Sequence, residues 1–293
     1  MQIRRPIVLG IVRSYKVDKL APFVLSLRRS GYKGDIGFFV DDLPLETLEF
    51  FYEHGVTMQP LPPRYYIQSR RHIIRALAKL APPKFRNRAE IELSRYYLHL
   101  IDARWPCYYE FLQRTRGLYS HVMFCDIKDV IFQRNPFDFD WKAPLCSFYT
   151  PPDVLIREDE KTYGWIKTGF GEAEARRMQD LRVIGCGVTF AESEAALEYA
   201  RLMCENFIRI NARGLVDQGV HNYLLHHNKV KSSYIYGFDE TPVLHLGMVP
   251  KEKLRVNEQG LALNGSGDVA HVVHQYAEHM PALQPSFDKL TTL

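Results

Sequence analysis

One stretch, HVMFCDIKDVIFQRNPF at His121–Phe137, constrains the fold more than any other. Its first apolar run ends abruptly in two carboxylates, Asp126 and Asp129. A buried strand that delivers acids at its carboxyl end is typical of open α/β sheets, which bind ligands at that edge. Two close carboxylates cost free energy unless a positive group offsets them, and the usual group is a hard divalent cation. We therefore predict a strand over His121–Phe132 and a site among these acids.

The remaining elements follow a mixed order that begins with strand, helix, strand. Apolar runs predict strands at Pro6–Val12, Asp35–Val40, Val56–Leu61, Leu145–Thr150, Leu181–Ala191, Ser233–Gly237, Val243–Met248 and Val269–Tyr276. Helical spacing predicts helices at Val17–Ser30, Leu45–His54, Arg64–Leu80, Ala89–Tyr97 continuing towards Leu112, Ser193–Arg209 and Val216–His227. The charged segment Asp153–Asp180 allows no assignment, and one interpretation is a mobile loop over the site. The order indicates an α/β protein with a mixed central sheet flanked by helices.

Composition excludes several classes of function. The net charge of +4, from 38 Lys and Arg against 34 Asp and Glu, is too small to predict a nucleic-acid partner. The five cysteines form no CxxC pair, which predicts reduced, buried thiols in a reducing compartment. The first apolar run is too short for a signal peptide, and no run approaches the ~20 residues of a membrane span. We expect a cytoplasmic protein with no transmembrane segment, and a peripheral membrane contact through a basic face stays open.

Three further groups of residues are candidates for a site. In VDQGVHN, the side chains of Asp217, Gln218 and Asn222 lie near a predicted helix start, although Asp217 alone could be a simple N-cap. Glycines 185 and 187 flank Cys186 in mid-strand, which indicates either the close approach of another group or a bulge.

In HVVHQY, strand alternation lets only one of His271 and His274 face a given site. Several basic residues could bind phosphate, although solvated helix faces explain most Arg and Lys. These residues are Arg13, Lys16, Arg70, Arg71, Arg95 and Lys128.

Together these motifs resemble the nucleotide-sugar glycosyltransferases of the GT-A fold. CDIKDVIFQRNPF is similar to the family's DxD-type motif, in a variant with two residues between the acids. LSRYYLHL, which contains Arg95, is similar to the helix before that motif. IGCGVTFAES resembles the acceptor strand, with Gly185-Cys186 in place of the family's Asn-Ala, and VDQGVHNYLL resembles its Asp-Gln…Asn helix. VVHQY resembles the carboxyl-terminal segment that carries a metal-binding histidine. The resemblance spans Ile7 to Tyr276.

The resemblance implies one GT-A-like domain over 1–293, with a Rossmann-like nucleotide-binding half at about 1–140 and an acceptor half at about 141–293. It implies transfer of a hexosyl or pentosyl group from a UDP- or GDP-sugar to a hydroxyl of a glycan, a lipid-linked sugar or a protein, with Mn²⁺ or Mg²⁺ as cofactor. The implied metal ligands are Asp126, Asp129 and His274. The implied nucleotide and donor contacts are Val12, Arg13, Tyr15, Asp41, Arg95, Asp126 and Lys128. Asp217 would take the proton from the acceptor hydroxyl or orient the donor sugar. Gly187 and Gln218 would contact the acceptor.

Two other functions are compatible with the same residues. A nucleotidyltransferase acting on sugar phosphates also uses paired acids and metals, but its glycine-rich loop is absent after the first strand, where Arg13-Ser14-Tyr15-Lys16 stand. A GT-A-like domain that binds a sugar or a partner without turnover is the non-enzymatic alternative. Metal-dependent hydrolysis of a nucleotide sugar would distinguish an enzyme from such a binding domain.

Overall fold

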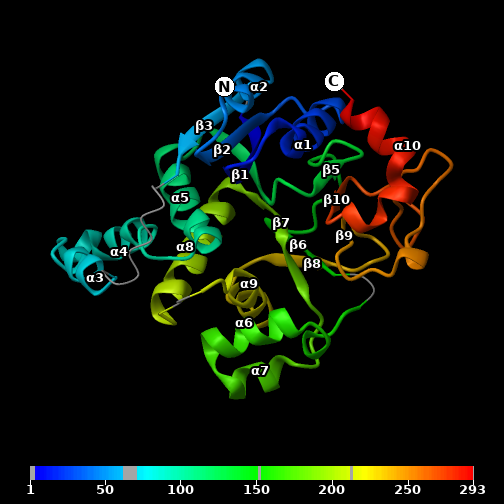
Figure 1. Cartoon of the computed structure of the whole chain (residues 1–293). Coiled ribbons are helices and arrows are strands. Elements are labelled where there is room, and N and C mark those ends of the chain that lie inside the picture. The colour runs from blue at the N-terminus through cyan, green and yellow to red at the C-terminus, as the bar shows by residue number, and fades with distance from the viewer. Residues whose placement is uncertain (1–3, 62–70, 151–152, 212–213, 293) are drawn as a thin grey trace.

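The computed structural model describes residues 4–61, 71–150, 153–211 and 214–292 (Figure 1). Its strands are β1 Arg5–Arg13, β2 Asp35–Asp41, β3 Val56–Pro60, β4 Tyr119–Cys125, β5 Val130–Phe132, β6 Leu145–Tyr149, β7 Ile184–Glu192, β8 Ser233–Tyr236, β9 Val243–His245 and β10 Val272–His274. Its α-helices are α1 Val17–Arg29, α2 Leu45–Glu53, α3 Arg71–Lys79, α4 Arg86–Ser94, α5 Leu100–Arg114, α6 Glu160–Phe170, α7 Glu172–Met178, α8 Ser193–Arg209, α9 Asp217–His226 and α10 Met280–Thr291.

Seven strands form the central sheet in the order β3-β2-β1-β4-β7-β6-β8. The strands β1 to β4 run parallel, β7 is antiparallel to both β4 and β6, and β8 is parallel to β6. The predicted class, a mixed sheet flanked by helices, is therefore confirmed. A second sheet has the order β5-β10-β9, in which β10 is antiparallel to β5 and parallel to β9.

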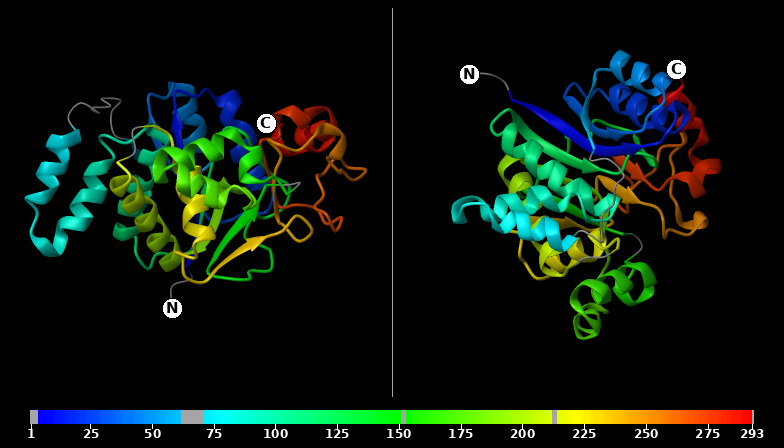
Figure 2. Two further views of the ribbon diagram at one scale, coloured as in Figure 1. Left: turned by 90° about the horizontal axis from the view of Figure 1, so that it is seen from below. Right: turned by 60° about the vertical axis from the view of Figure 1, so that its left-hand side comes forward.

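Helices cover both faces of the central sheet (Figures 1 and 2). Strand alternation sends Ile7 and Leu9 of β1 into a core formed with α5 and α8, whereas Val8 and Val12 pack against α1. Both sets of side chains are almost fully buried. Because β1 is buried on both faces, its sequence reads as a continuous apolar run rather than an alternating one.

The predicted motif strand is wrong in one respect, because the chain leaves the central sheet after Cys125 and enters the second sheet at Val130. The residues between these strands, which include Asp126 and Asp129, form the turn that joins the two sheets. This break places both acids at a junction rather than inside a strand.

Two other expectations need correction. The helix predicted from Ala89 towards Leu112 is two helices, because the backbone of His99 is extended and its side chain accepts a hydrogen bond from the Ile101 N–H to begin α5. The charged segment Asp153–Asp180 contains α6 and α7 rather than a loop, and Asp159 caps α6. α10 is not among the predicted helices. In the predicted helix Arg64–Leu80, the residues before Arg71 lie outside the described part of the chain.

None of the helices in the described ranges is both long enough and apolar enough to span a bilayer.

Candidate functional site

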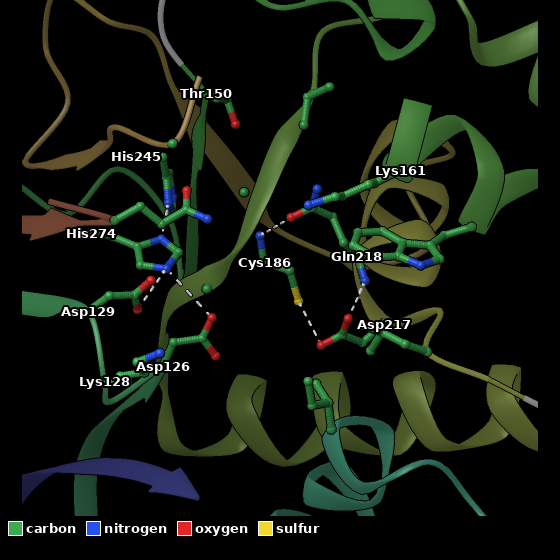
Figure 3. A pocket seen from close by; sticks show the side chains of 18 of the residues that line it. Asp126, Lys128, Asp129, Thr150, Lys161, Cys186, Asp217, Gln218, His245 and His274 are labelled. Carbon is green, nitrogen blue, oxygen red and sulfur yellow. Dashed lines mark hydrogen bonds and ion pairs between the residues drawn. The ribbon is translucent and has the colours of Figure 1, made fainter. Parts of the chain in front are cut away.

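A cavity of about 870 Å³ lies where the carboxyl ends of several strands meet. β1 and β4 bring Arg13 and Asp126 to this cavity, β9 and β10 bring His245 and His274, and the start of α9 brings Asp217. Figure 3 shows His274 facing Asp126 and Asp129 on one side of the cavity, with Asp217 on the other side. A cleft at the carboxyl edge of parallel strands is where open α/β sheets bind ligands.

His274 lies against both acids of the motif. Its Nε2 atom is 3.6 Å from Asp126 Oδ2 and 3.5 Å from Asp129 Oδ1. The imidazole is buried, whereas the two carboxylates are each a little over one third exposed to the cavity. Burial raises the pKa of Asp129, an effect that His274 opposes and the charge of Asp126 reinforces. The three side chains therefore form one compact polar group at the cavity.

A second histidine holds His274 from behind. His245 lies directly opposite His274 in the parallel β9–β10 register, and their Nδ1 atoms are 2.8 Å apart. Burial lowers the pKa of His245 well below its usual range, so this ring is neutral at physiological pH. Its Nε2 is buried and has no hydrogen-bond partner within the described ranges. An unpaired acceptor is cheaper to bury than an unpaired N–H, so without a ligand His245 donates from Nδ1 to His274.

The two histidine rings explain the glycines in the middle of β7. A Cβ atom at Gly185 would lie 2.6 Å from His245 Nε2, and one at Gly187 would lie 2.2 Å from His274 Cε1. The pairing of β6 with β7 is also irregular next to these positions. The sequence left two explanations for these glycines, a strand irregularity and the close approach of another group, and both apply. The groups that approach are the imidazole rings of His245 and His274.

Arg104 is the buried cation of the site. Its Nη1 donates to Asp126 Oδ1 at 2.5 Å and its Nη2 donates to Asp217 Oδ2 at 2.6 Å. The side chain is only 6% exposed, and the guanidinium also lies 5.5 Å from the Trp105 ring. One guanidinium thus bridges the strand-end acid and the acid of α9, with the fork geometry that suits two carboxylates.

Asp217 is the first residue of α9, because Val216 occupies the N-cap position. Asp217 Oδ1 accepts the N–H of Gln218 at 2.8 Å, and Oδ2 accepts from Arg104. Burial raises the pKa of Asp217, with Arg104 acting in the opposite direction. The buried Asp102 of α5 lies nearby and accepts the Val216 N–H at 3.3 Å. Asp217 thus accepts a first-turn N–H of α9, as a capping residue does, but it also pairs with Arg104 and lines the cavity, which a capping role alone does not explain.

Gln218 and Asn222 connect α9 to its neighbours. Asn222 Oδ1 accepts the Ile184 N–H and its Nδ2 donates to the Ile184 carbonyl, both at 2.9 Å, which fixes α9 on β7. Asn222 is fully buried, so its role is structural. Gln218 Nε2 donates to Thr162 Oγ1 at 2.6 Å, which ties α6 to the same helix. Gln218 also lines the cavity, and α6 therefore forms one of its walls.

Most of the site residues predicted from the sequence line this cavity. They are Arg13, Tyr15, Asp126, Lys128, Asp129, Gly187, Asp217, Gln218 and His274. Three predicted nucleotide contacts do not. Val12 is fully buried against α1, Asp41 forms an ion pair with Arg13 at 2.9 Å, and Arg95 is paired with Glu110 at 2.5 Å.

The other candidates have structural surroundings. His271 Nδ1 lies 2.7 Å from the Asn135 carbonyl, so His274 is the histidine that faces the site. Arg71 is buried with its guanidinium 5.2 Å from the Tyr97 ring, and Lys16 is exposed before α1. Arg70 lies outside the described residues.

Sequence reasoning missed Arg104, His245 and the contribution of α6. The signal for Arg104 was its place beside Asp102 at the start of LIDARWPCYYEFL, a largely apolar helix. The signal for His245 was a histidine inside the short apolar run VLHL. Lys161 and Trp165 of α6 also line the cavity, but their segment offered no periodicity that would predict it.

The cavity is more negative than the chain that forms it. Its described lining holds six carboxylates, and four Arg or Lys, whereas the whole chain carries +4. The six are Asp126, Asp129, Glu158, Asp159, Glu160 and Asp217, and the four are Arg13, Arg104, Lys128 and Lys161. An anionic ligand that entered alone would meet this excess of negative charge.

The donor types of Asp126, Asp129 and His274 fit Mn²⁺ or Mg²⁺. Two carboxylates and an imidazole are chemically suitable, although in the described ranges no three His, Cys, Asp or Glu side chains already form a complete metal cluster. An incomplete protein set is the usual arrangement for a cation that also binds substrate phosphates. The His245–His274 pair could present the Nε2 lone pair of His274 by reversing its hydrogen bond.

Comparison with protein families and with curated proteins finds no match. Among solved structures, the apo crystal structure of mouse xyloside xylosyltransferase 1 is similar, with a TM-score of 0.49 and 12% sequence identity. The similarity covers 94% of this chain and 98% of that chain.

Proposed function

We propose that this protein is a glycosyltransferase that moves a sugar from a nucleoside-diphosphate donor to a hydroxyl acceptor, with a divalent metal as cofactor. One observation carries the proposal: a single cavity at the carboxyl edge of the sheet joins Asp126, Asp129 and His274 on one side to Asp217 on the other. A diphosphate leaving group needs positive charge, and this cavity has a net deficit of it. A bound Mn²⁺ or Mg²⁺ would supply that charge to the leaving group.

The donor nucleotide is assigned to the part of the cavity beside β1. Arg13 and Tyr15 line it at the end of β1, and Lys128 lines it from the turn that joins the two sheets. In the proposed complex, Lys128 binds a phosphate oxygen and the Tyr15 ring contacts the base. Asp41 acts indirectly, since its ion pair holds the Arg13 side chain in place.

Transfer forms a bond from the acceptor oxygen to the anomeric carbon and breaks the bond from that carbon to the diphosphate. The diphosphate leaves with the electron pair, and the hydroxyl proton must pass to a base. Asp217 is the proposed residue for this proton or for orienting the donor sugar. Its Oδ1 accepts one hydrogen bond, from the Gln218 N–H, and its Oδ2 accepts from Arg104 and from the Cys186 thiol. Its raised pKa increases its affinity for a proton.

The acceptor is assigned to the wall formed by α6 and the start of α9. Trp165 offers a partly buried aromatic surface, and Lys161 and Gln218 offer polar groups beside it. Aromatic rings flanked by hydrogen-bonding groups suit a sugar, which has both apolar and hydroxyl faces. The proposal therefore includes a glycan as the acceptor class.

The test is release of nucleoside diphosphate from UDP- and GDP-sugars with Mn²⁺, together with thermal melts. We expect one donor to raise the melting temperature and to be turned over, because a ligand of the folded state stabilises it. Asp126→Asn, Asp129→Asn and Asp217→Asn should each reduce turnover by roughly 10²–10⁴-fold. Glu110→Gln is the control: this carboxylate of α5 is paired with Arg95 and does not line the cavity, so turnover should stay at the parent rate. Full activity in Asp217→Asn, or activity insensitive to a chelator, would refute the assignment.

A further inference from the structure

The helical hairpin formed by α3, the short turn at Pro83–Phe85 and α4 extends from one side of the molecule (Figures 1 and 2). We call residues 71–94 the basic hairpin. Its first helix has an inner face that packs on the protein body. Arg71 and Ala78 are buried there, and Arg75 donates from Nη1 to Asn211 Oδ1 at 3.2 Å.

The outer face of α3 carries large apolar side chains. Ile73, Leu77 and Leu80 follow one another at intervals of four and three residues, so they share the side opposite the buried Arg71 and Ala78. Their exposed fractions are 59%, 53% and 80%. Scattered exposed apolar residues are ordinary, but a stripe of three on the outward face of a protruding helix has no packing role within the described structure.

Phe85 extends this apolar surface at the tip of the hairpin. It lies in the turn before α4 and is 53% exposed. Lys84 lies next to it, with Nζ 5.8 Å from the centre of the Phe85 ring. The apolar surface therefore continues from α3 into the turn at the tip of the hairpin. There, the apolar side chains could leave water for an apolar environment without any movement of the protein core.

The charge of the hairpin is mainly positive, and its two acids, Glu90 and Glu92, lie together in α4, where Glu92 is paired with Arg88. Residues 71–89 contain six Arg or Lys and no Asp or Glu, in a chain whose total charge is only +4. Lys79, Lys84 and Arg86 are exposed around the apolar stripe. A helix with Leu, Ile or Phe on one side and flanking cations is typical of segments that lie in the interface of an anionic membrane.

We propose that the basic hairpin binds the surface of an anionic lipid bilayer. Ile73, Leu77, Leu80 and Phe85 insert among the lipid headgroups, and the flanking cations contact the lipid phosphates. Charge complementarity favours this occupant over a second copy of the chain, since two hairpins that met would bring like charges together. The proposal does not depend on the reaction in the cavity.

The test is co-sedimentation of the whole chain with vesicles of phosphatidylcholine alone and of an equal mixture of phosphatidylcholine and phosphatidylglycerol. We expect binding to the mixed vesicles only, weakening as salt rises. Each cation near the surface is worth a factor of about five in partitioning, so Lys79→Glu/Lys84→Glu/Arg86→Glu should weaken binding by more than about 100-fold. Leu77→Ser/Leu80→Ser should weaken it by at least about tenfold per side chain.

Matched control variants carry the same changes on other exposed surfaces. Leu45→Ser/Tyr52→Ser removes apolar groups from α2 that are 70% and 83% exposed, and Lys33→Glu/Lys231→Glu changes exposed charges elsewhere. Both should sediment like the parent, and thermal melts should be unchanged in all variants. Three results would overturn the proposal: no binding to anionic vesicles, equal losses in the controls, or a concentration-dependent dimer that the hairpin variants abolish.

Discussion

Replacing Gly187 by alanine is the most direct perturbation of the candidate site, because it adds a single methyl group next to His274. That methyl carbon would lie 2.2 Å from His274 Cε1 and 2.8 Å from both ring nitrogens. An ordinary contact begins near 3.4 Å, so the ring must move by at least 1.2 Å relative to β7. The imidazole is buried and held by His245, so it cannot simply rotate into solvent.

This displacement should lower both the stability and the activity of the protein. Overpacking a buried position costs about 1–3 kcal/mol, which should appear as a lower free energy of unfolding. A move of about 1 Å also separates His274 Nε2 from its contacts with Asp126 and Asp129, and misplacement on that scale costs a reaction roughly 10²-fold. Gly187→Ala should therefore lose activity more severely than its loss of stability explains.

Urea denaturation and turnover of the donor sugar measure the two effects. Gly237→Ala is the control, because its added methyl would meet nothing within 4 Å, and its stability should change by less than about 0.5 kcal/mol. The double variant Gly187→Ala/His274→Ala removes the obstacle, so the two stability changes should fail to add by 0.5 kcal/mol or more. Additive changes, or a Gly187→Ala variant as stable and active as the parent, would refute the steric account.

Two further predictions concern buried charge. Arg104→Met should lower the free energy of unfolding by about 3–5 kcal/mol, because it leaves the carboxylates of Asp126 and Asp217 without their shared cation, and urea denaturation checks it. His221 is buried with Nδ1 2.5 Å from the Tyr199 hydroxyl, and burial lowers its pKa to about 3. Below pH ~6.5 the His221 ring is protonated in the unfolded chain but stays neutral in the folded protein. The free energy of unfolding therefore falls as the pH decreases from ~6.5 towards the folded-state pKa of about 3. In the His221→Gln variant, the free energy of unfolding should decrease less steeply than in the parent, by roughly 1 kcal/mol per pH unit between pH 6 and 4. Urea denaturation at several pH values measures both slopes, and identical slopes would contradict this account.

Most elements of the fold could be predicted from the sequence because they are locally determined. The amphipathic pattern of Ser193–Arg209 gave the limits of α8 as the structure has them. The failures occur where tertiary contacts decide. The chain between Cys125 and Val130 changes sheets, which no local pattern encodes, and α6 has few buried residues to create a period.

The site residues show the same difference: some could be predicted from the local sequence, and others depend on tertiary contacts. Asp126 and Asp129 were predictable because they interrupt an apolar run, and the choice between His271 and His274 needed only the strand register. Arg104 was not predictable as a site residue, since its partners lie 22 and 113 residues away along the chain. Val12 and Asp41, predicted as nucleotide contacts, do not line the cavity: strand alternation directs Val12 into the core next to Arg13, and Asp41 pairs with Arg13.

The acids of the site and the buried Arg104 form one electrostatic cluster. Arg104 bridges two carboxylates, and Asp102 adds a third acid whose pKa is raised well above its usual range, first by burial and then by the charge of Asp217. Burial likewise raises the pKa of Asp129. Because Arg104 is shared, removing either Asp126 or Asp217 leaves it paired with the other acid, so each single change should destabilise the fold less than Arg104→Met does. Under the proposed function, a cation that entered with a diphosphate would offset the excess negative charge of the cavity lining, so the two ligands should bind more tightly together than either does alone.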